Sequence, residues 1–452
     1  MTAIAEPQGR TSLPDKAQLE QLVQQVLDEA RRQGATAAEA SASVGSGLSV
    51  QVRNGAVDTL EHQRDRSLAV AVYFGQRQGT ASSADFSPAS IRATVEAACA
   101  IARHTSEDPA QGLADPELLA RDVPDLDLYH PWALSPDDAV ELALSCEAAA
   151  LSVDSRITKS DSAGVSSNVS VRVYGNSHGF MGGYHGSRHG MNCVVIAEDG
   201  GGMQRDYWYT VDRDAQRLDA PEAVGRKAAD HALKRLGAGQ VPTRRVPVVY
   251  HATMARGLLG HLVSAVRGGS LYRKASFLLD SIGTPVLPKG LSLTEHPHLP
   301  RALGSAPFDN EGVATRERDL VSDGVLQGYV LDSYSARKLG MTTTGNAGGV
   351  HNLHLPPGDS DLDGLLNTMG EGMLITELMG QGINMVTGDY SRGAAGYWVE
   401  GGEITRPVQE VTVAGNLRDM LLGIQAVGND VDTRGNIHTG SILIDGMTVA
   451  GS

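Results

Sequence analysis

Leu48-Ser-Val50-Gln-Val52 and Ser67-Leu-Ala-Val70-Ala-Val72-Tyr-Phe74 alternate apolar with small or polar side chains, and Asn54-Gly55 lies between them. Alternation with a period of two residues predicts strands that bury one face. An Asn-Gly pair favours the tight turn of a β-hairpin. Helical patterns flank the hairpin, one beginning after Asp15 and the other at Pro88. We therefore expect a helix, a β-meander and a second helix, in that order.

The same order of elements recurs in the next part of the chain. Its predicted members are a helix from Pro136, strands at about 165–174, 191–197 and 203–210, and a helix at 221–236. Residues 110–136 are rich in Asp and Pro and are interpreted as a linker. We therefore expect a disordered tail over residues 1–13 and an N-terminal α+β region over 14–240, with halves at about 14–109 and 136–240.

Beyond residue 240 the sequence favours short strands separated by glycine-containing turns. Val246-Pro-Val-Val-Tyr250 is typical of a buried strand and leads into a helix at about 253–266. The clearest hairpin spans residues 316–331 around Ser322-Asp323-Gly324. Further strands are predicted at 372–377, 383–387, 395–400, 408–413 and 442–444. The prediction for residues 241–452 is a β-rich domain resembling a sandwich or a barrel, so the fold class is α+β.

Composition excludes several classes of function. The 452 residues carry 38 Lys and Arg against 53 Asp and Glu, a net charge of −15, which argues against direct binding to nucleic acid. The chain has no apolar run of the roughly 20 residues that span a bilayer, and its start lacks the pattern of a signal peptide. Cys99, Cys146 and Cys193 are widely spaced, which favours free, buried thiols in a reducing compartment. We therefore expect a cytoplasmic protein without membrane contact.

Histidines are the first candidates for metal ligands. The tightest group, in a glycine-rich stretch, is His178, His185 and His189. An H-x3-H pair binds zinc well when a helix presents both rings on one face, but these glycines favour strands and turns. A surface or interface role is therefore the preferred interpretation for this group. Two other pairs are weaker candidates still: His296 with His298, and His351 with His354, which would point to opposite faces of a strand.

His251 stands out because it ends a predicted buried strand and precedes a helix. A zinc peptidase needs a second histidine on that helix and a carboxylate that takes a proton from the metal-bound water. The residue after His251 is Ala252, which cannot accept a proton, and Arg256 would repel a cation. His261 lies ten residues on, roughly 80° around a helix. These neighbours argue against a metal at His251.

Other chemical motifs are incomplete. The serine in Gly388-Asp-Tyr-Ser-Arg-Gly-Ala394 does not have the spacing of a nucleophile elbow. Gly345-Asn-Ala-Gly-Gly349 lacks the Lys-Ser/Thr of a phosphate-binding loop. Asp389, Glu400 and Glu403 could form an acidic cluster, but solvated strand ends are the preferred interpretation.

Several long segments nevertheless carry a family resemblance. One is Thr376-Glu-Leu-Met-Gly-Gln-Gly-Ile-Asn-Met-Val-Thr-Gly-Asp-Tyr-Ser-Arg-Gly-Ala-Ala-Gly-Tyr-Trp-Val-Glu400. Others are Thr412-Val-Ala-Gly-Asn-Leu-Arg-Asp-Met420, the ending at 440–451, Gly345-Asn-Ala-Gly-Gly-Val-His-Asn-Leu353 and Met203-Gln-Arg-Asp-Tyr207. Together they resemble the PmbA/TldE branch of the TldD/PmbA family, from about residue 20 to the C-terminus.

This resemblance implies a cytoplasmic bacterial protein that joins a zinc-bearing TldD-type subunit in a complex that degrades or matures peptides. The family was once described as modulators of DNA gyrase. In the TldD branch an H-E-x-x-x-H motif and a cysteine near the C-terminus hold zinc. Carried over, the three motif positions fall on His251, Ala252 and Arg256, and no cysteine follows Cys193. The resemblance therefore implies no catalytic residues and no metal in this chain, with zinc on the partner.

We accordingly expect a PmbA/TldE-like subunit that shapes the substrate cavity. Residues 388–396 are predicted to lie nearest that chamber. The residues expected to contact substrate or partner are His251, Gly388, Asp389, Ser391 and Arg392. Two alternatives remain open. One is a homo-oligomeric peptide-binding or regulatory protein, for example a homodimer when alone. The other is a self-sufficient metallopeptidase that uses His251 with His261 or with the histidines at 178–189.

Overall fold

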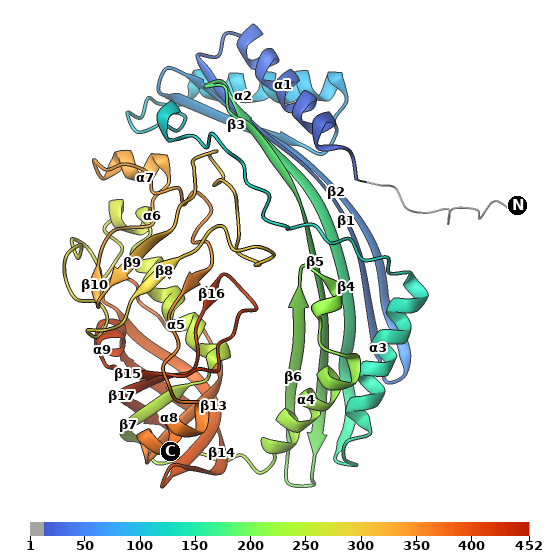
Figure 1. The fold of residues 1–452 in the computed structure, drawn as a ribbon, viewed down its shortest axis with the longest axis vertical. Helices are drawn as coiled ribbons and strands as arrows, with labels where there is room; N and C mark the ends of the chain where they lie inside the picture. The colour runs from blue at the N-terminus through green and yellow to red at the C-terminus, as the bar shows by residue number, and fades with distance from the viewer. Residues whose placement is uncertain (1–12, 452) are drawn as a thin grey trace, which may run out of the picture.

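The computed structural model describes residues 13–451. Its N-terminal region is a single curved antiparallel sheet of six strands in the order β3-β2-β1-β4-β5-β6 (Figure 1). The strands are β1 (Ala37–Arg53), β2 (Ala56–Phe74), β3 (Arg77–Ser83), β4 (Ile157–Asn176), β5 (Met181–Glu198) and β6 (Met203–Asp212). The helices are α1 (Lys16–Arg32), α2 (Pro88–His104), α3 (Pro136–Leu151) and α4 (Pro221–Lys234). The predicted repeat of helix, β-meander and helix is confirmed, and the first meander has a third strand, β3, that was not predicted.

The predicted β-hairpin with its turn at Asn54-Gly55 is present. Arg53 pairs with Ala56, and both residues of the turn have positive φ, 50° at Asn54 and 79° at Gly55. Both strands are longer than predicted. Residues 56–67 of β2 lack the pattern of a strand, because they are almost entirely exposed and carry charged side chains without alternation. Pairing with β1 extends this stretch as a strand even though no buried face marks it.

Both helix pairs cover the same face of this sheet. Even-numbered residues of β1 pack against α1 and α2 at one end of the strand and against α3 and α4 at the other. Antiparallel pairing of β1 with β4 joins the two halves. The other face meets the C-terminal domain through a small cluster that includes Tyr174, Phe180, Phe308 and Val313. The predicted linker holds one short helical turn, η1 (Pro116–Leu118), and a second turn, η2 (Ala215–Arg217), precedes α4.

The C-terminal domain is built on a barrel-like sheet. Its strands are β7 (Arg244–Tyr250), β12 (Gly372–Met379), β13 (Asp389–Glu400), β14 (Glu403–Asn416), β15 (Ile424–Val427) and β17 (Ile442–Ala450). The order is β14-β13-β12-β7-β17-β15, and a further pairing of β14 with β17 closes the ring. The prediction of a β-rich, barrel-like domain is therefore confirmed. The only parallel pair in the described barrel joins β7 to β12.

A smaller sheet and five helices complete this domain in the described part of the chain. The small sheet has the order β10 (Val325–Leu326), β9 (Arg318–Ser322), β8 (Leu293–Glu295), β11 (Leu353–His354) and β16 (Ile437–His438). The helices are α5 (Ala252–Ala265), α6 (Gly268–Tyr272), α7 (Ser333–Lys338), α8 (Leu362–Met369) and α9 (Leu417–Leu422). Helix α8 packs on the outer side of β7 and β12, whereas α5 joins the main apolar core.

Some local predictions differ from the structure. Residues 383–387 form no strand; a single bridge joins Ile383 to Tyr390. Gly388 has φ 83° and ends that turn, so β13 begins at Asp389, earlier than predicted. Of the predicted tail, residues 1–12 lie outside the described residues, while Leu13 packs against the first core cluster.

Two predictions about whole-chain properties can also be compared with the structure. The three cysteines are free and buried, as expected. Among residues 13–451 no helix is both long enough and apolar enough to cross a bilayer.

Candidate functional site

His251 lies at the junction of β7 and α5. Its backbone N–H donates to the carbonyl oxygen of Ile375 at 3.0 Å, which holds the end of β7 against β12. Its side chain caps α5, because Nδ1 accepts the Thr253 backbone N–H at 3.4 Å and lies 2.8 Å from Thr253 Oγ1. Since Nδ1 accepts a hydrogen bond, we assign the proton of the neutral ring to Nε2. Burial lowers the pKa of His251, which keeps the ring neutral.

His251 opens onto a cavity of about 480 Å³. This volume lies within the usual range of small-molecule sites, roughly 300–1,000 Å³. The cavity is bounded by β6, α4, α5 and the barrel strands β12 to β14, and Figure 1 shows β6 at the edge of the N-terminal sheet. Its walls are Asp206, Tyr207, Trp208, Tyr209, His231, Lys234, His251, Thr253, Met254, Arg256, Leu362, Leu374, Thr376, Tyr397, Ile404, Thr405, Arg406 and Pro407. Aromatic and aliphatic groups thus share this site with about as many polar and charged ones.

Two arginines flank one buried carboxylate beside the cavity. Asp432, whose side chain is 4% exposed, accepts from Arg434 Nε at 2.9 Å and from Arg434 Nη2 at 3.1 Å. Arg434 Nη1 also donates to the Tyr209 carbonyl oxygen at 2.9 Å. Burial would raise the pKa of Asp432, but the hydrogen bonds and charge of Arg434 outweigh it and lower that pKa. Arg434 therefore uses three of its five N–H donors to join Asp432 to β6.

Arg256 is engaged less completely. Its Nη2 donates to the Tyr209 hydroxyl at 3.1 Å, and its Nη1 lies 3.9 Å from Asp432 Oδ2, beyond hydrogen-bond distance. Its side chain is 33% exposed and lines the cavity. Arg256 thus lines the same cavity as His251 and retains free donors.

The surroundings of His251 do not suit a metal ion. Ala252 contributes only its backbone N–H, which donates to Ser441 Oγ at 3.0 Å, and that hydroxyl donates to Asp430 at 2.6 Å. Arg256 brings a permanent positive charge to the other motif position. Across residues 13–451 no three His, Cys, Asp or Glu side chains are grouped so that they could hold a metal ion.

The other histidines that we considered as ligands are not near His251. His189 is fully buried, with Nδ1 3.0 Å from Ser167 Oγ and Nε2 2.8 Å from the His130 carbonyl oxygen. His178 lies in the turn between β4 and β5, and His185 packs on Tyr129. His261 packs against Tyr390. None of these candidates lines the His251 cavity.

The segment predicted to lie nearest the chamber also lies outside this cavity: none of Gly388, Asp389, Ser391 and Arg392 is among its lining residues. Asp389 is exposed and accepts from the Thr387 hydroxyl at 2.6 Å. The Ser391 backbone N–H donates to the Gly382 carbonyl oxygen at 2.7 Å. Arg392 Nε is buried without a hydrogen-bond partner in the described structure. Asp389 pairs with Asn416 while Glu400 pairs with Glu403, so the two ends of β13 separate these carboxylates.

Sequence reasoning missed the aromatic wall and the Asp432–Arg434 pair. The available signal was composition: aromatic residues are 4% of the chain, yet Tyr207, Trp208 and Tyr209 are consecutive. They lie in β6, which is an edge strand of the sheet. Exposed apolar side chains gathered in one place often mark a binding surface. Nothing local marks Asp432 or Arg434, which reach the site from the loop before β16.

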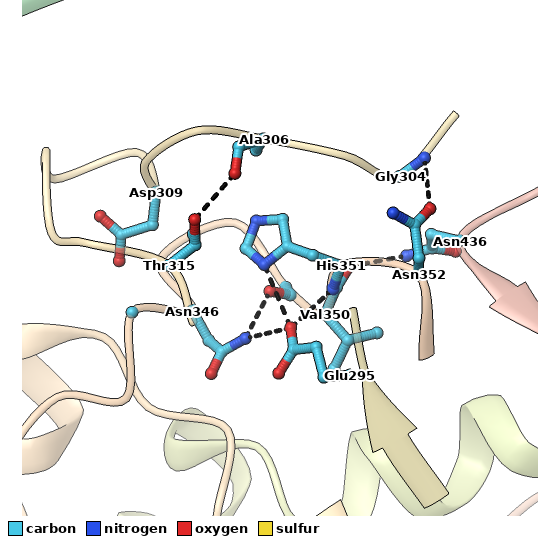
Figure 2. Close-up of polar contacts among 12 residues, drawn as sticks. Glu295, Gly304, Ala306, Asp309, Thr315, Asn346, Val350, His351, Asn352 and Asn436 are labelled. Atoms are coloured by element: carbon cyan, nitrogen blue, oxygen red, sulfur yellow. Dashed lines mark hydrogen bonds and ion pairs between the residues drawn. The ribbon is translucent and has the colours of Figure 1, made fainter. Parts of the chain in front are cut away.

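The Gly345–Leu353 motif forms a second polar cluster in the same domain. Figure 2 shows the Glu295 carboxylate beside His351 and Asn346. Glu295 Oε1 accepts from the His351 backbone at 2.6 Å and from Asn346 Nδ2 at 2.8 Å, and it lies 3.1 Å from His351 Nδ1. Asn352 accepts from the Gly304 N–H at 3.0 Å. These contacts hold three loops together.

Comparison with known proteins identifies the class as metallopeptidase-like. Models of PmbA/TldA metallopeptidases match the chain in three parts: domain 1 at residues 38–102, the central domain at 129–236 and the C-terminal domain at 243–451. Metalloprotease PmbA of Escherichia coli O157:H7 is 51% identical over 92% of each chain. The Metalloprotease PmbA homolog of Haemophilus influenzae is 48% identical over 96% of each chain. The chain belongs to the PmbA/TldD family.

Solved structures share its fold. A protein described as a modulator of DNA gyrase, from Bacteroides thetaiotaomicron, matches with a TM-score of 0.92 at 29% identity, covering 98% of this chain and 100% of its own. TldE from Thermococcus kodakarensis matches with a TM-score of 0.84 at 20% identity, covering 95% of this chain and 100% of its own. The latter likeness is one of fold.

Proposed function

We propose that this chain is the supporting subunit of a cytoplasmic metallopeptidase complex. In this proposal a TldD-type partner holds the zinc ion, and this chain forms part of the wall of the chamber in which peptides bind. The high identity to proteins named Metalloprotease PmbA supports a role in proteolysis. The three buried, free cysteines are consistent with a reducing compartment.

The chemistry around His251 is the observation that carries this proposal. Hydrolysis at a zinc ion requires ligands for the ion and a base for its water. Here Ala252 offers no base, Arg256 donates to Tyr209, and the His251 ring presents an N–H group at Nε2. A cavity remains, with an aromatic wall, between the two regions of the chain. Such a cavity can orient a peptide without taking part in proton transfer.

The test is a comparison of three samples: this chain alone, a TldD-type subunit alone and their mixture. We expect the chain alone to contain no stoichiometric zinc by atomic absorption and to cleave no peptide. We expect the mixture to co-elute on a sizing column and to cleave unfolded peptides. Stoichiometric zinc or peptidase activity in the chain alone would overturn the proposal. A stable homodimer that ignores the second subunit would instead favour a homo-oligomeric binding protein.

A further inference from the structure

The two arginines near Asp432 differ in how many of their donors are used. Arg434 donates twice to Asp432 and once to the Tyr209 carbonyl oxygen. Arg256 makes a single hydrogen bond within the described residues, to the Tyr209 hydroxyl. A guanidinium has five N–H donors, so most of those on Arg256 remain free. Because Arg256 lines the cavity, these donors are available to a bound molecule.

His251 adds a second donor to the same cavity. Its Nδ1 accepts the Thr253 N–H, so Nε2 carries the ring proton and has no hydrogen-bond partner within residues 13–451. A free N–H and a permanent cation that line one cavity attract an anion and repel a metal ion. A carboxylate suits this pair best, because a guanidinium binds it through two parallel hydrogen bonds.

One part of the cavity suits an apolar group, while Asp206, Lys234 and Arg406 add charged side chains elsewhere in its lining. The rings of Tyr207 and Tyr209 stack along β6 with their centroids 6.4 Å apart, and Tyr397 lines the same cavity. Leu374, Met254 and Ile404 are among the aliphatic lining residues. Ile404 and Tyr207 are 48% and 46% exposed, so a ligand would remove much apolar surface from water.

We propose that this cavity binds the C-terminal residue of a peptide. Arg256 and His251 hold the α-carboxylate, and the apolar side chain of that residue packs against Tyr207 and Tyr397. The N–H groups that would donate to a carboxylate and the apolar wall share one cavity of about 480 Å³. A C-terminal residue fits both, because its α-carboxylate is joined directly to the carbon that bears its side chain. An internal Asp or Glu would bring a carboxylate without an apolar group attached to it. The choice of a peptide as ligand rests on the proposed function.

The test is isothermal titration calorimetry on the chain alone with three blocked peptides. The first is N-acetyl-Ala-Ala-Phe with a free carboxylate, the second is its C-terminal amide, and the third is N-acetyl-Ala-Asp-Ala amide. We expect the free acid to bind at least about tenfold more tightly than either amide, the gain typical of a hydrogen-bonded charge. Replacing Phe by Gly in the free acid should weaken binding as well.

Arg256→Gln should abolish the preference for the free acid, and Arg256→Lys should restore part of it. Arg273→Gln is the matched control, because it removes an equal charge from an exposed residue outside the cavity and should leave the preference unchanged. Circular dichroism establishes that each variant is folded.

Equal binding of acid and amide, binding of neither, tighter binding of the Asp peptide, or a preference that survives Arg256→Gln would each overturn the proposal. Co-elution of the same variants with a TldD-type subunit is followed separately. The carboxylate site can therefore fail while the subunit assignment stands, and the reverse also holds.

Discussion

The His251 cavity, which lies between the two regions of the chain, and the Glu295–His351 cluster, which lies within the C-terminal domain, differ in how their polar groups are used. At Glu295 every carboxylate oxygen accepts a hydrogen bond from the protein itself, as Figure 2 shows for its contacts with His351 and Asn346. His251 and Arg256 line a cavity, and within the described residues His251 Nε2 and all but one of the Arg256 N–H groups have no hydrogen-bond partner. A buried carboxylate whose two oxygens both accept hydrogen bonds from the protein stabilises the fold, whereas donors left free at a cavity are candidates for binding a ligand.

The largest expected effect is at Glu295. Its side chain is 2% exposed and also accepts from Arg318 Nε at 2.9 Å. Burial alone would raise the pKa of Glu295, but His351 and Arg318 hold it below the ordinary value. Glu295→Gln leaves the Arg318 charge buried without a counterion, so we expect a loss of about 3–5 kcal/mol in the free energy of unfolding. Urea denaturation measures this loss.

Glu317→Gln is the control, because that side chain is 71% exposed and, among residues 13–451, pairs only with His296. It should change the unfolding midpoint little. Similar effects of the two substitutions would mean that the Glu295 cluster does not stabilise the fold.

The next effect separates the two arginines around Asp432. Arg434→Gln removes two hydrogen bonds to a buried carboxylate and one to β6, and we expect it to cost about 2–3 kcal/mol. Arg256→Gln removes one bond to a hydroxyl and should cost about 1 kcal/mol or less. Chemical denaturation of both variants provides the comparison. Equal losses in the free energy of unfolding would contradict the distinction between Arg434, whose guanidinium stabilises the fold, and Arg256, whose guanidinium is available to a ligand.

A smaller effect concerns the cap of α5. His251→Ala removes the side chain that accepts the Thr253 N–H, and loss of an N-cap typically costs about 1 kcal/mol. His251→Asn should retain the cap, because Asn is among the preferred N-cap residues. Thermal unfolding should therefore rank the wild type and the Asn variant together, above the Ala variant. A fully stable Ala variant would show that the cap is dispensable.

The smallest effect is a pH dependence. Burial lowers the pKa of His251 in the folded state, so the unfolded chain takes up the proton more readily. The stability that His251 contributes is present above the unfolded pKa, about 6.5, and is lost as pH falls through the lowered folded value. His251→Asn should therefore lose less stability than the wild type between pH 7 and pH 5. Parallel curves for the two proteins would contradict this assignment.

Local patterns predicted most of the fold. The helix starts after Asp15, at Pro88 and at Pro136 and the turn at Asn54-Gly55 are each set by neighbouring residues. Such signals lie within a few positions of one another, and the sequence alone displays them. The middle of β2 was missed because pairing with β1, rather than any hydrophobic period, makes it a strand.

The candidate site was predicted only in part. The notable position of His251, between a strand and a helix, was visible from the sequence, and so was the unsuitability of Ala252 and Arg256 for zinc. The stretch from Gly388 to Arg392 was expected to lie nearest the chamber, yet these residues do not line the His251 cavity. A glycine-rich sequence indicates turns and places where the backbone lies close to another group, but it does not identify that group.

The sequence by itself determined the order of helices and β-meanders in residues 14–240, the family and the chemical character of the residue at each motif position. Only the tertiary structure decided that β14 closes on β17 and that Tyr209 meets Arg256, 47 positions away, and Arg434, 225 positions away. Periodicity, caps and turns act over a few residues and are therefore legible in the chain. A cavity depends on contacts between distant segments, which arise only when sheets and loops pack against one another.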